Sequence, residues 1–230
     1  DSDDSIAVAV IADPAIQHDP RPQDPVSDQV RSWAETLPRL PWAAHEAKFI
    51  SGLFPHETIS LTGEGATRSA LLSEAHRNAK VLHIATHGYF KEEGADNVGF
   101  ALASSSGSGS SGFVTLTEIL AHEFSNELVV VSGCDSALGE TFDGEGSQSV
   151  SRAFLAGGTQ AVIGTLWPVS DRASAAFMEH FYSALAREGD VSEALRNAQR
   201  ALQKSRRFRE PFYWAPYVLT TVRLRNRIAF

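Results

Sequence analysis

Two residues of this chain could together perform nucleophilic chemistry, namely Cys134, the single cysteine, and His87. A thiolate is a strong nucleophile, and an imidazole beside it can hold the thiol proton and later deliver it to a leaving amine. Each residue has a glycine neighbour, Gly88 after the histidine and Gly133 before the cysteine. Glycine lets the backbone turn sharply and approach a substrate closely. These residues therefore predict a site in which a cysteine attacks an amide carbonyl.

Such an attack also needs hydrogen-bond donors for the negative oxygen that develops in the transition state. Our candidates for this oxyanion hole are the main-chain N–H groups of Gly88 and Cys134. Cys134 follows His87 by 47 residues, close to the interval of roughly 50 residues between histidine and cysteine in caspases. A lone cysteine at the end of an apolar strand is more often an inert small hydrophobic residue. The prediction therefore depends on the placement of both residues.

Acidic residues cluster directly after the cysteine and suggest a preference for basic substrates. Asp135 and Glu145 are our candidates for substrate binding, because carboxylates in a specificity pocket would favour Lys or Arg before the scissile bond. The alternative is that this segment is a solvated loop. Trp167 is a third candidate, as an aromatic pocket wall, although Trp167 and Trp214 could equally pack in the core.

Metal and cofactor sites are less well supported. His83 lies four residues before His87, and together with Cys134 it could suggest zinc. A structural zinc site usually needs four Cys or His ligands at short spacing, however, and a histidine inside an apolar strand fits a hydrogen-bonded core residue better. The piece Gly144–Gly146 is too short for a dinucleotide-binding loop, and no Walker-type Gly-Lys-Ser occurs in the sequence. We predict neither a metal nor a cofactor.

Two apolar segments are expected to position the cysteine and the histidine. Val81–Ala85 predicts a strand that ends two residues before His87, and Leu128–Ser132 predicts a strand that ends two residues before Cys134. The carboxyl ends of parallel strands lie at one edge of a sheet, which is where such sheets bind ligands. We therefore expect both side chains at neighbouring strand tips.

The rest of the chain alternates between strand and helix patterns. Further strands are expected at Ile6–Ala12, Glu57–Leu61, Ala161–Thr165 and Tyr217–Val222. Helices are expected at Pro41–Leu53, Thr67–Asn78, a segment ending at Ala156, Asp171–Arg187 and Ser192–Lys204. This alternation predicts an α/β fold, a mostly parallel sheet with helices on both faces.

The length of 230 residues fits a single domain over residues 1–230, because no convincing linker divides the chain. Residues 1–25 would form the first strand and a Pro-rich loop. Residues 104–112 contain only Ser and Gly and predict a flexible loop, natural or engineered. The only methionine is Met178, so we expect the chain to have been trimmed, cleaved or cut from something longer.

Charge and composition narrow the possible partners and the compartment. A formal net charge of −8 argues against binding to nucleic acid or to anionic lipid, both of which need dense Lys/Arg patches. No apolar run is long enough for a membrane span, and the N-terminus does not resemble a signal peptide. One cysteine cannot form an internal disulfide, which fits a reducing compartment. We expect a cytoplasmic protein with no direct nucleic-acid or membrane contact.

Several ordered sequence blocks resemble one family. The blocks are Val81–Gly88 (VLHIATHG), Leu128–Leu138 (LVVVSGCDSAL), Gly144–Gly146 (GEG), Ser151–Gly158 (SRAFLAGG), Gly164–Val169 (GTLWPV), Phe181–Tyr182 (FY), Glu193–Arg196 (EALR) and Pro211–Pro216 (PFYWAP). Together, over about Ile6 to Leu219, they resemble the CHAT domain, a family of caspase- and separase-like cysteine peptidases of the clan CD type. Members are often attached to tetratricopeptide repeats.

The resemblance implies a caspase-hemoglobinase-like fold, with His87 as the catalytic histidine and Cys134 as the catalytic cysteine. It implies a protein endopeptidase acting on a protein or peptide substrate in bacterial regulated proteolysis, such as antiviral defence or programmed death. The resemblance also implies that a regulatory partner, or a missing upstream segment such as tetratricopeptide repeats, would control the peptidase. Gly133 and Ser136 replace the family's usual alanine and threonine, which bears on pocket shape more than on the Cys-His pair. The alternatives are a non-catalytic interaction module and an autoinhibited zymogen.

Overall fold

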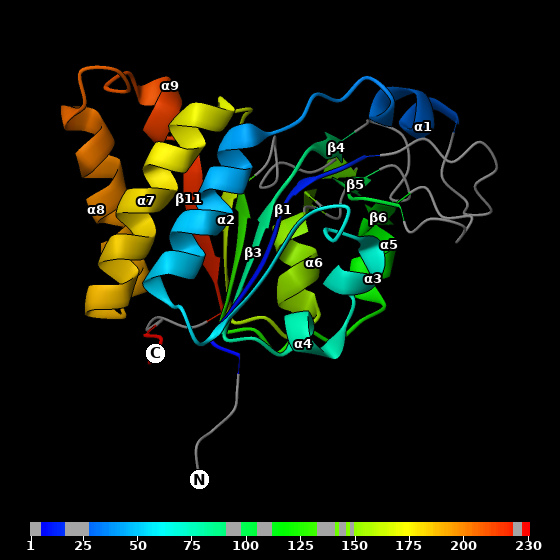
Figure 1. The fold of residues 1–230 in the computed structure, drawn as a ribbon, viewed down its shortest axis with the longest axis horizontal. Coiled ribbons are helices and arrows are strands. Elements are labelled where there is room, and N and C mark those ends of the chain that lie inside the picture. The colour runs from blue at the N-terminus through cyan, green and yellow to red at the C-terminus, as the bar shows by residue number, and fades with distance from the viewer. Residues whose placement is uncertain are drawn as a thin grey trace, which may run out of the picture.

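Figure 1 shows the fold of the chain in a computed structural model. The structure describes residues 6–16, 28–90, 98–104, 112–132, 141–142, 146–147, 150–222 and 227–230. Of the segments with notable composition, the Pro-rich loop is described only as far as Ile16, and the Ser/Gly stretch only at Ser104 and Gly112. The single-domain organisation and the flexible Ser/Gly loop stay predictions.

A six-stranded sheet forms the centre of the molecule, with the strand order β11-β10-β7-β3-β1-β2. These strands are β1 (Val8–Pro14), β2 (Thr58–Gly63), β3 (Val81–Ala85), β7 (Leu128–Ser132), β10 (Ala161–Thr165) and β11 (Tyr217–Thr221). All neighbouring pairs are parallel except β10 and β11. The residues of β1, β3, β7 and β10 are all buried, as expected for parallel strands covered on both faces. The predicted mostly parallel α/β fold is confirmed.

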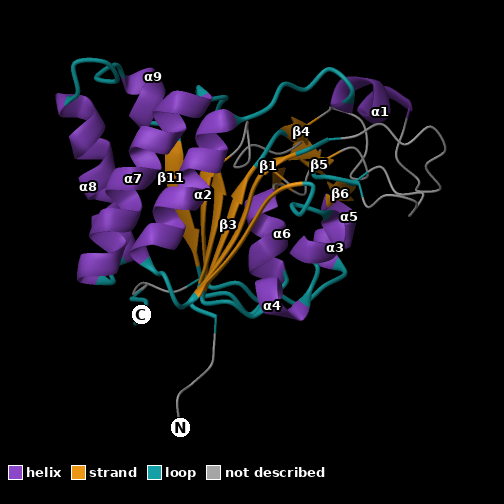
Figure 2. Ribbon diagram, viewed as in Figure 1, coloured by secondary structure: helices purple, strands orange, loops and turns teal. Residues whose placement is uncertain are grey.

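Four helices lie on one face of this sheet (Figure 2). They are α2 (Pro41–Leu53), α7 (Asp171–Glu188), α8 (Val191–Lys204) and α9 (Pro211–Trp214). Pro41 stands in the first turn of α2, where its missing N–H removes no helical bond. The Ser170 side chain accepts a hydrogen bond from the N–H of Ala173 and so caps α7. The apolar sides of α2, α7 and α8 pack on every second residue of the strands, such as Val8, Val10 and Val130.

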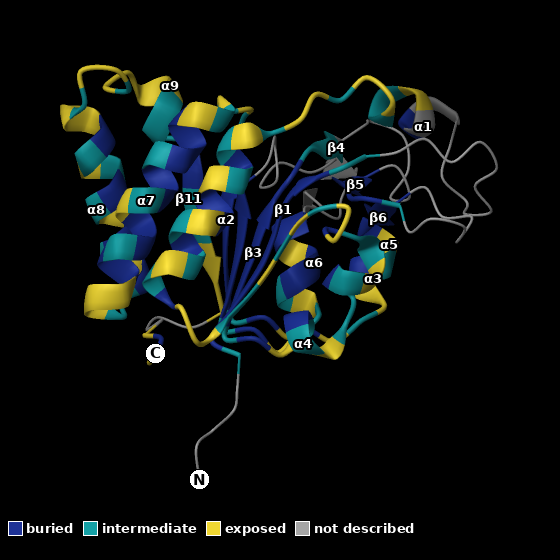
Figure 3. Ribbon diagram, in the orientation of Figure 1, coloured by how far each residue is buried: buried dark blue, intermediate teal, exposed yellow. Residues whose placement is uncertain are grey.

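The opposite face is covered by shorter elements (Figure 3). They are α3 (Arg68–Leu71), α4 (Glu74–Arg77), α5 (Leu116–Leu120), α6 (Val150–Ala156) and a small antiparallel sheet of β4 (Gly88–Phe90), β5 (Val98–Ala101) and β6 (Phe113–Thr115). The separate helix α1 (Asp28–Ala34) packs on this small sheet through Trp33, whose ring lies 4.7 Å from that of Tyr89. Two further short strands, β8 (Thr141–Phe142) and β9 (Gly146–Ser147), pair with each other.

Most predicted element boundaries agree with the structure, and one helix differs. Thr67–Asn78 was expected to be a single helix, whereas the structure has α3 and α4 with a break at Leu72–Ser73. The Ser73 backbone is extended, and its hydroxyl donates to the carbonyl of Ala70 at 2.8 Å. Serine side chains compete in this way with helical backbone bonds, and the apolar spacing does not reveal it.

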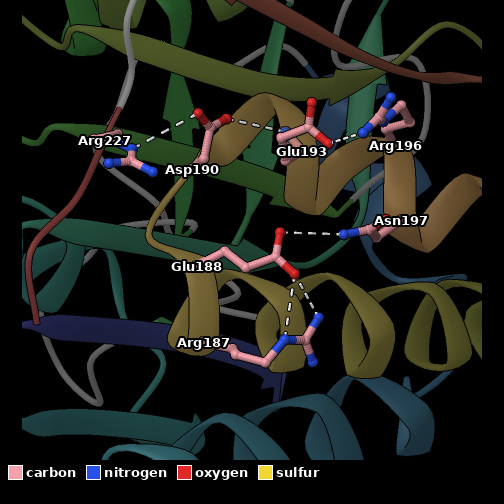
Figure 4. A network of polar contacts seen from close by, with 7 residues as sticks. All are labelled: Arg187, Glu188, Asp190, Glu193, Arg196, Asn197 and Arg227. Atoms are coloured by element: carbon pink, nitrogen blue, oxygen red, sulfur yellow. Dashed lines mark hydrogen bonds and ion pairs between the residues drawn. The ribbon is translucent and has the colours of Figure 1, made fainter.

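The turn between α7 and α8 is held by polar contacts at the end of α7 farthest from Asp171 (Figure 4). Gly189 ends α7 in a left-handed conformation with φ of 67°, which glycine adopts without strain. Asp190 then caps α8 by accepting a hydrogen bond from the N–H of Glu193 at 3.0 Å, and it lies 4.0 Å from Arg227. Asn197 donates to Glu188 across the turn at 3.3 Å. These contacts fix the antiparallel packing of α7 and α8.

Within the described ranges, no helix has both the length and the apolar composition needed to cross a lipid bilayer.

Candidate active site

The strands that precede the two candidate catalytic residues are neighbours in the sheet. β3 and β7 pair in parallel, with Ala85 opposite Ser132. His87 follows β3 by two residues, and Cys134 follows β7 by two residues in the sequence. The predicted adjacency of these two strands is thus present in the fold. Cys134 itself, together with Gly133, Asp135, Ser136 and Glu145, lies outside the described residues.

His87 is partly exposed, and one of its ring nitrogens has a definite partner. Its Nε2 lies 2.8 Å from the main-chain carbonyl oxygen of Pro38. A carbonyl can only accept, so the Nε2 atom must carry the hydrogen of the neutral ring. The tautomer assigned by this contact leaves Nδ1 as the nitrogen that can accept a proton.

The backbone around His87 is held by the small sheet. Ala101 of β5 donates its N–H to the carbonyl of His87 at 3.0 Å, and the buried Thr86 hydroxyl donates to the carbonyl of Ala101. Gly88 begins β4 opposite Phe100. The segment that follows β3 is therefore fixed by non-local bonds on both sides of His87.

Asp13 indirectly supports the Pro38 contact. It is buried at the end of β1 with φ of 44°, a conformation that Asp tolerates better than most side chains. Its carboxylate accepts bonds from Arg39 Nε at 2.9 Å and from the N–H of Leu40 at 2.8 Å. Burial raises the pKa of Asp13, but the bonds from Arg39 and Leu40 outweigh it and leave the pKa below its usual value. The ionised carboxylate therefore anchors the segment that presents the Pro38 carbonyl.

Sequence reasoning missed this role, because the expected first strand ends at Ala12 and no function was assigned to Asp13. The available signal was an acidic residue at the carboxyl end of a buried strand, the same position that singled out His87 and Cys134.

A cavity of about 150 Å³ opens beside His87 at the carboxyl edge of the sheet. Its walls come from the ends of β3, β7 and β10 and from the N-terminal halves of α2 and α7. The lining residues are Leu40, Ala43, Glu46, Thr86, His87, Ser132, Thr165, Val169, Asp171 and Ser174. Among the described lining residues, the ionisable groups besides the histidine are the carboxyls of Glu46 and Asp171. The lining is therefore acidic.

Asp171 joins the two helices that flank the cavity. It accepts a hydrogen bond from the N–H of Trp42, at the start of α2, on Oδ2 at 2.9 Å. Burial, together with the nearby negative charge of Asp13, raises its pKa, while the bonds from the start of α2 and the proximity of His87 act in the opposite direction. Asp171 is thus a partly desolvated carboxyl at the cavity wall.

Glu46 and His83 form a buried pair below the cavity. His83 Nε2 lies 3.0 Å from Glu46 Oε2, and His83 Nδ1 lies 3.1 Å from the Tyr182 hydroxyl. Burial raises the pKa of Glu46, and the bond from His83 opposes this effect. His83 is therefore a hydrogen-bonded core histidine, as the sequence favoured. In the part of the chain that the structure describes, no group of three or more His, Cys, Asp or Glu side chains is arranged to bind a metal.

The two tryptophans singled out from the sequence are only partly buried, and the indole N–H of each donates a hydrogen bond. Trp167, in the β10–α7 connection, is partly exposed and donates its indole N–H to the carbonyl of Phe212 at 3.0 Å. Trp214 donates to the carbonyl of Arg209 at 3.0 Å and packs partly against the core. Trp167 lies in the same connection as the cavity residue Val169 but is not itself among the lining residues. Its role in substrate binding stays a prediction.

Comparisons with known proteins agree with this architecture. Tetratricopeptide repeat protein 28 of Mus musculus is 37% identical over 106 residues, and that of Homo sapiens is 35% identical over 106 residues. Each match covers 46% of this chain and 4% of the relative, so the chain spans a small part of these proteins.

Among solved structures, the Arg-specific cysteine proteinase gingipain R has a TM-score of 0.60 at 11% identity, with 95% of this chain and 47% of that chain covered. The separase–securin complex of Saccharomyces cerevisiae has a TM-score of 0.55 at 14% identity, with 94% and 12% covered. At these identities the likeness concerns the fold, and it confirms the predicted caspase-hemoglobinase-like architecture. Because residues 2–221 match the CHAT domain and the fold agrees with that match, the chain belongs to the CHAT domain family.

Proposed function

We propose that this chain is a cysteine endopeptidase in which Cys134 is the nucleophile and His87 is the acid-base residue. The observation that carries the proposal is the pairing of β3 with β7, Ala85 opposite Ser132, because both residues follow these strands by two positions. His87 is held by the Pro38 carbonyl in the tautomer that leaves Nδ1 available.

In the proposed mechanism, His87 Nδ1 takes the proton of the Cys134 thiol, and the thiolate attacks the scissile carbonyl carbon. The main-chain N–H groups of Gly88 and Cys134 would stabilise the resulting oxyanion. When the intermediate collapses, the C–N bond breaks and the Nδ1 proton passes to the leaving amine. Water then hydrolyses the thioester, with His87 as base, and regenerates the thiol.

Two carboxyls lie within electrostatic reach of His87 in the proposed site. They are those of Asp13 and Asp171, whose pKa values are both affected by His87.

The acidic cavity supports a basic substrate residue before the scissile bond. Asp171 and Glu46 line it, and the lining includes no Lys or Arg side chain among the described residues. We propose that the cavity receives a Lys or Arg side chain, with Asp135, Glu145 and Trp167 as additional substrate contacts.

The setting of this activity is also a proposal. We infer a cytoplasmic protein whose protein partners include tetratricopeptide repeats, since the relatives are tetratricopeptide repeat proteins. Bacterial regulated proteolysis in antiviral defence or programmed death is proposed on family resemblance, although these relatives are mammalian.

The activity is tested by labelling and digestion with the wild-type chain beside Cys134→Ala. We expect a peptidyl electrophile with Lys or Arg at P1, the position directly before the reactive group, to label the wild type much faster than it labels glutathione. Proteome digestion should give cuts after Lys or Arg, and the variant should give neither labelling nor cuts. A non-catalytic docking module would instead cleave nothing, and the wild type and Cys134→Ala would bind a partner protein equally well. A zymogen would become labelled only after its activating cleavage or partner is supplied.

A further inference from the structure

A chain of buried hydroxyl groups connects Glu46 to the last residue of β7. The Ser132 hydroxyl lies 3.5 Å from Glu46 Oε1 and 2.6 Å from the hydroxyl of Ser174 on α7. Tyr217, on β11, donates its hydroxyl hydrogen to Ser174 at 2.9 Å. All four residues are at least nine-tenths buried. Glu46 therefore receives two branches, one through Ser132 and one through His83.

The chemistry of the groups allows one consistent set of hydrogen-bond directions. Tyr217 donates to Ser174, which leaves the Ser174 hydrogen for Ser132 and the Ser132 hydrogen for Glu46. In the other branch, Tyr182 can donate to His83 Nδ1, and His83 Nε2–H then donates to Glu46. Both branches then end on the Glu46 carboxyl, one on each of its two oxygens.

A buried carboxyl in this position is costly for the fold. Burial of a charge is unfavourable even when the charge is paired, and apolar residues of similar size often replace such pairs without loss of stability. The special feature of this network is its position, because Glu46, Ser132 and Ser174 all line the cavity beside His87. Of these three, Ser132 belongs to the strand that leads, two residues later, to Cys134.

We propose that Glu46 is a positioning residue of the candidate active site, whose carboxylate holds the Ser132 hydroxyl and thereby fixes the carboxyl end of β7. This proposal rests on the proposed role of Cys134 as nucleophile. Ser132 is tied to α2 through Glu46 and to α7 through Ser174, so both helices that flank the cavity fix the strand end. Small displacements of a reacting group cost large factors in rate, and errors near 1 Å can cost about 100-fold.

A purely structural role of the network predicts a different pattern. Tyr182 belongs to the same network but reaches Glu46 only through His83, and it neither touches β7 by a hydrogen bond nor lines the cavity. If the network only satisfies buried polar groups, its members should affect stability and leave turnover per folded molecule unchanged. If Glu46 positions β7, members that touch Ser132 should affect turnover.

The test uses the full chain with Ser132→Ala and Glu46→Gln. Readouts are kcat and KM on a peptide cleaved by the wild type, melting temperature, and the alkylation rate of Cys134 by iodoacetamide. We expect kcat and the alkylation rate per folded molecule to fall at least about tenfold in both variants, with the KM of Ser132→Ala within about twofold of the wild-type value. Ser132→Thr keeps the hydroxyl and should restore both rates to within about threefold. The control Tyr182→Phe should lower the melting temperature and keep kcat within about twofold.

Wild-type kcat in Ser132→Ala and Glu46→Gln would overturn the proposal. The proposal would also be overturned if Ser132→Ala, Glu46→Gln and Tyr182→Phe all lost kcat equally and in proportion to their loss of melting temperature. Ser132→Ala removes a single oxygen, so it serves as the deciding variant if Glu46→Gln does not fold. Failure of the proposed function is recognised separately, by a wild type that cleaves nothing. Even then, alkylation rates that equal those of the wild type in both variants would reject the positioning role.

Discussion

At the scale of single residues, the candidate site depends on a carboxylate that never contacts the reacting groups. Asp13 is buried at the end of β1 and holds Arg39 and Leu40, next to the residue whose carbonyl accepts from His87. Asp13 thus connects the stability of the fold with the tautomer of His87. Arg39 is 60% exposed, so solvent screens its side of the ion pair.

We therefore predict that Asp13→Asn lowers both stability and turnover. Asparagine tolerates the positive φ, so the change removes charge without adding backbone strain. The unfolding free energy should fall by roughly 1–2 kcal/mol at neutral pH, the value for charge-assisted bonds to a buried carboxylate when solvent screens one partner, here Arg39. Turnover should fall because the Pro38 carbonyl is less well held. Urea unfolding and kcat measurements check the two effects.

The pH dependence of this loss has a definite sign. The folded-state pKa of Asp13 lies below its unfolded value of 3.8, so its ionisation stabilises the fold above that pH. The contribution is lost as the pH falls through the folded pKa. The difference in unfolding free energy between wild type and Asp13→Asn should therefore be constant near neutrality and shrink below about pH 3.8. A difference that grew on acidification would contradict this account.

At the scale of elements, the small sheet decides where His87 lies. β5 bonds the backbone of His87 through Ala101, and β5 itself packs closely against β6. A Cβ atom added at Gly99 would lie 1.9 Å from the carbonyl oxygen of Val114 on β6. Gly99 is thus required for the close approach of these strands, a condition that no local pattern in the sequence indicated.

Gly99→Ala is predicted to push β5 and β6 apart, lower the melting temperature and reduce turnover, because Ala101 moves with β5. A methyl group forced against main-chain atoms typically costs about 1–3 kcal/mol.

Gly52→Ala is the matched control, since a Cβ atom on this glycine of α2 meets no atom within 4 Å. It should raise stability by about 0.5–1 kcal/mol, because alanine favours helix, and leave turnover unchanged. Thermal unfolding and kcat of both variants distinguish the two outcomes; a Gly99→Ala protein as stable as the wild type would refute the argument.

At the scale of the whole molecule, one sheet serves two apolar cores. Alternate residues of β1 belong to different cores, with Val8 and Val10 facing α2, α7 and α8, and Ala9 and Ile11 facing the shorter elements. Neither layer can lose its packing without exposing the strands that the other layer covers. The two cores are therefore expected to unfold together.

We predict a single cooperative unfolding transition for the chain. Loss of helix followed by far-UV circular dichroism should coincide with the change in tryptophan fluorescence. The fluorescence reports on Trp33 in α1, Trp42 in α2, Trp167 in the β10–α7 connection and Trp214 in α9. Two separated transitions would show that the layers are independent units, and would reject the single-domain prediction for residues 1–230. Asp190→Ala, at the cap of α8, should shift both signals together to lower temperature, because it loses a cap that is worth about 1 kcal/mol.

The sequence by itself determined the elements whose signal is local. The apolar runs of β3, β7 and β10 and the proline-started α2 agree with the predicted boundaries residue for residue, because buried strands and helix starts depend on neighbouring side chains. The same runs identified His87 and Cys134 as residues that follow strand ends, and the ordered blocks identified the family. The catalytic role of the pair stays a prediction.

Only the tertiary structure decided which groups support those positions. Asp13 meets Arg39 across 26 residues, Glu46 meets Ser132 across 86 residues, and His83 meets Tyr182 across 99 residues. Such contacts depend on how strands and helices assemble, so neither side-chain periodicity nor spacing encodes them visibly. For the same reason the sequence did not indicate that Glu46 and Asp171 line the cavity, since they lie on helices that approach His87 only in the folded chain. The proposed substrate contacts of Asp135 and Glu145 stay predictions.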